Sequence, residues 1–279
     1  MVCHSYGRIE ARASTTARRR NAAAATTLFP PRRVVLFSLS LSSLLSFLPI
    51  RPARAAAPLE LHPSSPDELL RVLADAPDDE MTTIVLGPGE WRLGSTLAVR
   101  TPVKMIGASG SEGTTIVLDT EEHYVPALTV TSPDATIESL SVRHRSPSVA
   151  NNYAVYIVQV AGNVTLRRLD VSSETGTGVA IEGGRGTVEI VDCVIHDTKN
   201  NGIGIFPDVV GDVGDVGDGT PDRGLQIRVS STTVRDNGRE AILGRGLGEG
   251  VAVRVEGFKE RIRGRVEFSN CEEADIDLI

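Results

Sequence analysis

The sequence predicts an all-β protein built as a solenoid, which is one continuous coil of short parallel strands. The first observation is a repeat: sliding residues 163–173 along the chain by 24 positions pairs Val164 with Val188 and Val171 with Ile195. The second is that short runs of Val, Ile, Leu and Thr are separated by Gly, Asn, Asp and Ser, which favour turns. The third is an aromatic content of 4%, as expected where stacked aliphatic side chains fill a narrow core. Each repeat of about 24 residues, called a rung below, accommodates three short strands.

The repeat continues on both sides of this segment. Downstream it fits at a shift of 39 positions, and the excess over the basic period coincides with DVVGDVGDVGDGTPD, which we interpret as an insertion. Upstream it fits at a shift of 29 positions. Because a fixed period is typical of solenoids, we expect the matched residues to be neighbours on adjacent strands. The further expected pairs are Val188 with Ile227, Ile190 with Val229, Ile195 with Val234, Ile137 with Leu166 and Val142 with Val171.

The chain divides by charge into a leader and a folded domain. Residues 1–57 hold nine of the 29 basic residues and one of the 36 acidic residues, which leaves 20 basic and 35 acidic residues and a formal charge of −15 in residues 58–279. Phosphate binding needs concentrated Lys and Arg, so this acidic domain is not expected to bind nucleic acid. We expect one solenoid domain over 58–279, with clear rungs over 116–270 and the insertion over 207–222.

The leader has two parts. Residues 1–29 are rich in Arg, Ala, Ser and Thr, which is typical of a transit peptide, and residues 30–57 carry an arginine pair, an apolar run and the small-residue cleavage site ARAAA. This order resembles bipartite thylakoid-lumen targeting sequences, and RRVVL resembles the twin-arginine motif. We therefore expect a location in the chloroplast thylakoid lumen and no membrane span in the mature form. A secreted or membrane-anchored protein is the alternative. The residues assigned to the signal are Arg32, Arg33, Ala53 and Ala55.

The two ends of the coil differ. A short capping helix is predicted over residues 66–75, because Ser65 and Glu68 form the capping-box pattern and Pro66 takes the first helical position. Such a helix covers the open end of a solenoid. The carboxyl end, CEEADIDLI, has no obvious cap, so an exposed strand edge there is a candidate surface for a homo-oligomer.

The stretch TIVLGPGEWRLGSTLAVRTPVKMIGASGSEGTTIVL and the rungs after it resemble right-handed parallel β-helices of the pectin-lyase-like superfamily. The rungs are most similar to the repeat proteins of the "right-handed β-helix region" family. This resemblance implies a right-handed coil, and it leaves the function open, because the family includes polysaccharide lyases, epimerases, accessory proteins and substrate adaptors. The polygalacturonase acidic cluster and the epimerase Asp-Pro-His do not occur in the sequence.

A predicted outward column supplies the first candidate site. Alternation along the strands puts Arg143, His196 and Arg235 on the outside of different rungs, with Arg167 beside them. Basic side chains and a histidine on one ridge suit an anionic sugar, and in an enzyme they would be candidates for charge stabilisation and proton transfer. The alternative is a solvated charged face held by weak ion pairs between rungs.

His196 and Asp197 are adjacent, as in many catalytic pairs, but we expect a structural role. Successive strand side chains point to opposite faces, so the two residues are not expected to act as a dyad. The longer, downstream shift matches Asp197 with Asp236, and both are expected to stabilise turns through side-chain bonds to the backbone.

Two polar segments are further candidate sites. HRSPSVANNYAVYI carries Asn151, Asn152 and Tyr153 at a predicted turn. Tyrosine with amides suits sugar contact, although Asn also favours turns because it tolerates positive φ. The insertion carries five aspartates that suit calcium, but their spacing does not match an EF-hand and the tandem triplet indicates slippage into a tolerant loop. We therefore expect no cofactor, with calcium as the alternative. These aspartates are Asp208, Asp212, Asp215, Asp218 and Asp222.

The cysteines are expected to be free. Cys193, Thr232 and Cys271 fall at equivalent positions when the downstream shift is applied twice, which separates the two cysteines by two rungs. Two strand spacings are about 9.6 Å, beyond the reach of a disulfide. The sequence therefore predicts two buried free thiols.

Together these observations favour a non-catalytic β-helix that binds a lumenal protein or a glycan. The alternatives are a polysaccharide lyase or epimerase that acts on a uronate polymer, and a structural component of an assembly.

Overall fold

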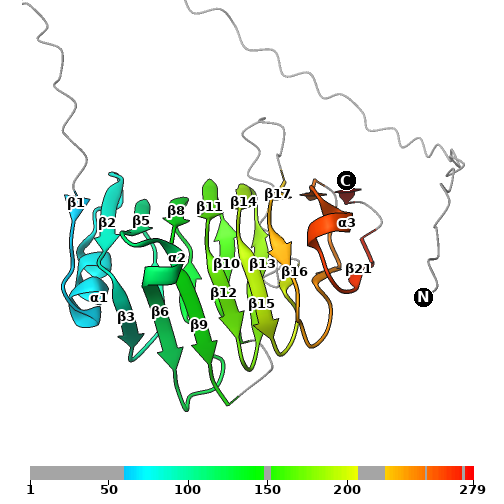
Figure 1. Ribbon diagram of the computed structural model, residues 1–279. Coiled ribbons are helices and arrows are strands. Elements are labelled where there is room, and N and C mark those ends of the chain that lie inside the picture. Colours follow the sequence, from blue (N-terminus) through cyan, green and yellow to red (C-terminus); the bar gives the residue numbers. More distant parts are fainter. Residues whose placement is uncertain (1–59, 148–151, 207–223, 249, 272–273) are drawn as a thin grey trace, which may run out of the picture. The chain divides into compact units, whose positions relative to one another are not determined.

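The structure is a computed structural model that describes residues 60–147, 152–206, 224–248, 250–271 and 274–279. It is all-β: the strands form three parallel sheets that wind into a right-handed parallel β-helix, as predicted (Figure 1). Each complete rung contributes one strand to sheet A, then one to sheet B and one to sheet C. The sheets are named in that order below.

The described strands of each sheet follow the chain from rung to rung. Sheet A contains β1 (Glu60–Leu61), β2 (Thr82–Leu86), β5 (Val103–Gly107), β8 (Asp134–Glu138), β11 (Asn163–Arg167), β14 (Thr187–Val191), β17 (Gln226–Ser230), β20 (Ala252–Val255) and β22 (Asp275–Leu278). Sheet B contains β3 (Gly89–Leu93), β6 (Thr114–Asp119), β9 (Ser141–Arg145), β12 (Asp170–Ser173), β15 (Val194–Thr198) and β18 (Thr233–Val234). Sheet C contains β4 (Leu97–Val99), β7 (Leu128–Val130), β10 (Tyr153–Val160), β13 (Thr177–Gly184), β16 (Ile203–Phe206), β19 (Ile242–Arg245) and β21 (Val266–Ser269).

The observed register confirms the shifts read from the sequence. Val164 pairs with Val188, and Val171 pairs with Ile195, as the shortest of the three shifts predicts. The longest shift pairs Val188 with Ile227 across the insertion. The remaining expected pairs, Ile190 with Val229, Ile195 with Val234, Ile137 with Leu166 and Val142 with Val171, are also observed. The apolar period therefore fixes which strands are neighbours.

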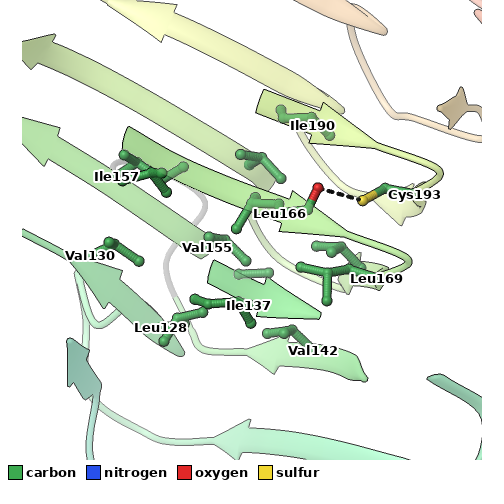
Figure 2. Packing of buried hydrophobic residues seen from close by; sticks show 14 of the residues in the cluster. Leu128, Val130, Ile137, Val142, Val155, Ile157, Leu166, Leu169, Ile190 and Cys193 are labelled. Atoms are coloured by element: carbon green, nitrogen blue, oxygen red, sulfur yellow. Dashed lines mark hydrogen bonds between the residues drawn. The ribbon is translucent and has the colours of Figure 1, made fainter. Parts of the chain in front are cut away.

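The core is a stack of aliphatic side chains inside the coil. In sheet A, Leu166 lies between Ile137 and Ile190 on the adjacent strands, and all three side chains are fully buried (Figure 2). A fully buried Leu or Ile contributes about 1.5–3 kcal/mol relative to an exposed one. Since every rung repeats this contact, each rung is stabilised mainly by its two neighbours.

The amino end carries the predicted helix α1 (Pro66–Asp75). The Glu68 backbone N–H donates to Ser65 Oγ at 3.2 Å, which confirms the N-cap. The return bond reaches one residue further back, because Ser64 donates from its backbone N–H to Glu68 Oε2 at 2.7 Å. Leu69 and Leu73 are buried in the core, so α1 covers this end of the coil. Two shorter helices, α2 (Gly110–Gly113) and α3 (Phe258–Arg261), lie further along the chain.

The predicted leader over 1–57 and the insertion over 207–222, with all five of its aspartates, lie outside the described residues. Among the residues that are described, no helix is long and apolar enough to cross a membrane. The targeting and calcium assignments therefore stay predictions.

Two kinds of tight corner connect the sheets. Between sheets A and B, successive rungs place Ser139, Arg168, Asp192 and Ser231 at φ values of 59°, 50°, 55° and 51°. A left-handed conformation costs about 1–2 kcal/mol for a residue with a Cβ. Backbone bonds between rungs offset that cost; for example, the Arg168 N–H donates to the Val191 carbonyl at 3.0 Å.

The corner between sheets C and A depends on glycine. A Cβ added at Gly186 would overlap the carbonyl oxygen of Gly162 in the rung before it, and a Cβ at Gly162 would overlap the carbonyl oxygen of Pro133. The Thr187 N–H donates to that same Gly162 carbonyl at 2.7 Å, so the approach is part of the hydrogen-bonded ladder. The corners stack this closely because neither glycine has a side chain.

Cys193 is a buried free thiol, as predicted. Its backbone N–H donates to Thr232 Oγ1 at 3.2 Å, which confirms that these two positions stack. The thiol lies 3.5 Å from the Leu166 carbonyl oxygen, to which it donates (Figure 2). It also lies 3.3 Å from the Val191 carbonyl oxygen. Burial raises the pKa of this thiol to about 11.

The prediction for Cys271 is wrong in two respects. Cys271 is free but half-buried, and it follows β21 in sheet C, whereas Cys193 follows β14 in sheet A. The longest shift does not continue past β17, because the next rung is shorter and pairs Gln226 with Ala252. Cys271 therefore does not stack over Thr232.

At the carboxyl end of the described residues, β22 is the outer strand of sheet A. Asp275 and Asp277 are exposed along it, and Leu278 and Ile279 are 38% and 54% exposed. Acidic side chains on an outer strand disfavour pairing with another strand. The homo-oligomer predicted at this end stays a prediction.

Candidate functional site

The predicted outward column exists on sheet B. Ser172 pairs with Arg143 on one side and His196 on the other, and the Arg235 N–H donates to the Ile195 carbonyl from the following rung. Arg143 is exposed and has no ion-pair partner within the described part of the chain, whereas Arg235 pairs with Asp236, the residue after it. The cations of sheet B thus lie on different rungs of one column, but Arg143 is more accessible to an anionic ligand than Arg235, which is already paired.

His196 contacts carboxylates through both ring nitrogens. Nδ1 lies 2.7 Å from Asp197 Oδ2, and Nε2 lies 3.2 Å from each carboxylate oxygen of Asp170. The His196 side chain is 17% exposed. Each ring nitrogen thus lies against a carboxylate, and neither is directed toward open solvent. This geometry does not suit proton abstraction from a substrate.

The expectation that His196 and Asp197 point apart is wrong. Ser172 pairs with His196 but Ser173 pairs with Thr198, so Asp197 is an extra residue in a β-bulge. Its φ of 48° breaks the strand alternation and turns its carboxylate toward the His196 ring. Asp236 has the same geometry, with φ of 54° and a bond to the Arg235 side chain. Both aspartates thus bond to side chains rather than to the backbone as expected.

Arg167 does not lie beside that column. It belongs to β11 of sheet A, where it pairs with Glu138 and Val191, while Arg143, His196 and Arg235 belong to sheet B or extend from it. The repeat indicates which positions in successive rungs are equivalent. It does not indicate which of the three sheets each position belongs to. One continuous basic ridge is therefore not formed.

Hollows that the sequence analysis did not identify lie on the outer face of sheet A, and three of them are lined by described residues. They measure 530, 250 and 490 Å³, and Arg228 lines all three. Arg228 pairs with Glu189 at 3.6 Å, and Arg254 on the next strand pairs with Glu256 at 3.2 Å. These side chains largely neutralise one another, as expected for a solvated charged face.

On sheet C, Asn152 and Tyr153 lie where the chain enters β10. Asn152 is 1% exposed and donates to Ser146 Oγ, so it lies inside the corner rather than on a surface. Asn151 lies outside the described residues.

Tyr153 belongs to an aromatic cluster on the outer face of sheet C. Its ring centroid is 4.9 Å from that of Tyr156, with a 33° angle between the planes. Tyr156 Oη donates to Glu182 Oε2 at 2.7 Å, and Phe206 pairs in register with Glu182 on the next strand. Tyr156, Glu182 and Phe206 are half-buried. We call Tyr153, Tyr156, Glu182 and Phe206 the sheet C cluster.

Small outward residues leave room for these rings. Ala180 pairs with Tyr156 on one side and with Gly204 on the other. A Cβ added to Gly204 would lie 2.8 Å from ring atoms of Phe206, so that ring lies over the glycine. The sequence signal that could have found the cluster is the basic period, which places alanine and then glycine beside Tyr156.

The sheet C cluster is also electrostatically distinct. Burial, and secondly the negative charge of Glu182, raise the pKa of Tyr153. Glu182 forms no ion pair with any described residue, and its register neighbours Val158 and Phe206 are apolar. The cluster therefore combines aromatic rings with a carboxylate that has no paired cation among the described side chains.

His144 is buried inside the coil, where its contacts are structural, and it does not belong to a surface site. His144 is 2% exposed; its Nδ1 lies 3.1 Å from Ser173 Oγ and its Nε2 lies 2.8 Å from the Val125 carbonyl. Burial lowers the pKa of His144. Across the described ranges, no three His, Cys, Asp or Glu side chains converge as they would to hold a metal ion.

Fold and surfaces together define a right-handed parallel β-helix with polar outer faces on sheets A and B and an aromatic one on sheet C. No family model and no curated protein matches the sequence. Solved structures match at low similarity. The protein ORF18 of Geobacillus virus E2 has a TM-score of 0.36 and 10% identity over 76% of this chain, and the chain spans 56% of that protein.

Two pectin methylesterase structures match over more of their length. One, in complex with a hexasaccharide, has a TM-score of 0.38 and 12% identity over 80% of this chain and 89% of its own. The other, from Aspergillus niger, has a TM-score of 0.31 and 9% identity over 81% of this chain and 87% of its own. At these levels of similarity, the function has to be argued from the chain's own residues.

Proposed function

We propose that this protein is a non-catalytic carbohydrate-binding β-helix, and that the sheet C cluster contacts the sugar. The observation that carries the proposal is the close, tilted ring pair of Tyr153 and Tyr156, with Glu182 hydrogen-bonded to Tyr156. Sugar rings present apolar C–H faces that pack on aromatic rings, and their hydroxyl groups donate to carboxylates. Sheet A offers charged pairs instead, and sheet B offers the exposed cation Arg143 and the pair of Arg235 with Asp236.

The chemistry of the described titratable groups supports binding rather than turnover. General acid–base catalysis needs a side chain with a proton or a lone pair directed at the substrate. The candidate His196 has both nitrogens against carboxylates, and His196, Arg143 and Arg235 belong to sheet B or extend from it rather than to sheet C. None of the catalytic candidates expected from the sequence therefore lies on the described surface that suits a sugar.

The test compares two substitutions on different faces. Tyr156→Ala removes a ring of the sheet C cluster, and Arg143→Ala removes an exposed cation of sheet B as the matched control. Calorimetric titration with a panel of oligosaccharides should show binding that Tyr156→Ala weakens at least about tenfold and Arg143→Ala leaves within about twofold. Loss in Arg143→Ala alone would move the site to sheet B, and failure of every oligosaccharide to bind would refute the proposal.

The cellular location enters as a second part of the proposal. The arginine pair at Arg32 and Arg33 supports delivery to the thylakoid lumen, and the ligand would then be a lumenal glycan or glycoprotein. Import of the full chain into isolated chloroplasts, followed by fractionation, tests this. Substitution of both arginines by Lys should leave the protein in the stroma, and an unchanged lumenal yield would contradict the twin-arginine assignment.

A further inference from the structure

We infer that Glu182 selects neutral or amino sugars and rejects uronates at the sheet C cluster. This inference rests on the proposed function, because it names the class of sugar that the same surface accepts. This class of sugar differs from the uronate polymer that the sequence analysis gave as an alternative substrate. The reasoning starts from the charge that the cluster presents to a bound ligand.

The Glu182 carboxylate accepts a hydrogen bond from the Tyr156 hydroxyl at 2.7 Å. It forms no salt bridge among the described residues, unlike Glu189 with Arg228 or Glu240 with Arg265. A hydroxyl donor leaves the negative charge uncompensated, whereas a guanidinium would neutralise it. The negative charge is therefore felt by any group that approaches the tyrosine rings.

The register neighbours of Glu182 add no compensating cation. Val158 and Phe206 flank it on the adjacent strands of sheet C. Continuing the same register places Arg245 opposite Phe206, two strands from Glu182, and Arg245 forms no ion pair with Glu182 among the described residues.

A carboxylate in this position discriminates between sugars by charge. It accepts hydrogen bonds from hydroxyl groups and attracts an ammonium group, but it repels the carboxylate of a uronate. Apolar and aromatic neighbours reduce local solvation, which strengthens the repulsion relative to an exposed position. Rejection by like charge is a common way to obtain specificity without additional contacts.

The experiment uses the full protein and oligosaccharides matched in length and linkage: a galactose oligomer, a galacturonate oligomer and a glucosamine oligomer. Isothermal titration should give at least about tenfold weaker binding for the galacturonate oligomer than for the galactose oligomer. Glu182→Gln keeps the shape and an acceptor oxygen but removes the charge. This substitution should bring the affinities for the galactose and galacturonate oligomers to within about twofold of each other and should weaken binding of the glucosamine oligomer.

The outcomes separate the inference from the function on which it rests. If sugars bind, Tyr156→Ala abolishes binding, and Glu182→Gln leaves the galactose-to-galacturonate ratio unchanged, the inference is wrong and the proposed function stands. A preference of the unmodified protein for galacturonate, lost in Arg245→Ala, would also overturn it. If no oligomer binds, both are refuted. Thermal melts of each variant confirm that it is folded.

Discussion

A close contact between stacked rungs gives the sharpest test of the fold, and it involves Gly186. Alanine there would place a methyl group onto the Gly162 carbonyl, which is backbone and accepts the Thr187 N–H. Overpacking costs about 1–3 kcal/mol, and a weakened hydrogen bond adds about 1 kcal/mol. A less flexible unfolded chain returns about 0.4–1 kcal/mol. We expect Gly186→Ala to destabilise the protein by about 2–3 kcal/mol.

For a domain of this size that loss lowers the melting temperature by about 5–10 °C. Differential scanning calorimetry and urea unfolding measure it, and Gly94→Ala is the matched control. A Cβ at Gly94 meets no atom within 4 Å, and Gly94 has no positive φ. Its melting temperature should stay the same or rise slightly. Equal melting temperatures for the two variants would refute the argument that stacked corners require glycine.

Three further predictions concern titration and backbone conformation. Burial lowers the pKa of His144 below its usual value of 6.5, so the unfolded chain protonates this histidine more readily than the folded protein does. The resulting contribution to stability is present above about pH 6.5 and is lost as the pH falls below that value. Thermal melts at pH 7.5 and pH 5.5 should therefore differ more for the native protein than for His144→Gln, and equal differences would contradict the assignment. In a Cys3→Ser background at pH 8, a thiol reagent should label Cys271 in the folded protein. Cys193 is buried and has a pKa of about 11, so it should react only after urea unfolding. Prompt labelling of two thiols would show that Cys193 is accessible. Ser231, at φ of 51°, should tolerate Gly but lose about 1–2 kcal/mol as Val in urea unfolding, since a β-branched residue resists the left-handed region; an unaffected Ser231→Val protein would argue against that corner geometry.

The architecture follows from the sequence because the apolar period and the strand spacing specify the same neighbours. The three shifts read from the sequence match the residues that the structure pairs, including Val188 with Ile227 across the insertion. The capping helix was equally readable, because Ser65 and Pro66 act locally. Such predictions need only the order of residues along the chain.

Predictions that depended on how the coil turns were less successful. Alternation predicted that Asp197 points away from His196, but a one-residue bulge reverses its direction. Extending the longest shift misplaced Cys271, because a shorter rung joins β17 to β20. Bulges and changes of rung length alter few apolar positions, so the hydrophobic pattern carries little information about them.

The candidate site shows a related limit. The sequence identified Tyr153 but not its partners Tyr156 and Glu182, although the basic period places Val158 beside Glu182. Recognising the cluster requires knowing which strands form sheet C and that Ala180 is small enough to expose a neighbouring ring. Arg167 was assigned to the wrong face for the same reason.

The register of sheet A is unbroken across the insertion, and this has a consequence for how such a protein can evolve. Glu189 and Arg228 are neighbours although the insertion lies between them in the sequence, just as Thr165 and Glu189 are neighbours across a rung that has none. The sheet thus keeps its alignment although Thr165 and Glu189 are 24 residues apart and Glu189 and Arg228 are 39 residues apart. Doubling a connection costs about 0.6 kcal/mol in loop-closure entropy, which is small beside the packing of one buried leucine. New recognition elements can therefore be inserted at a corner and later removed, while the scaffold beneath retains its geometry.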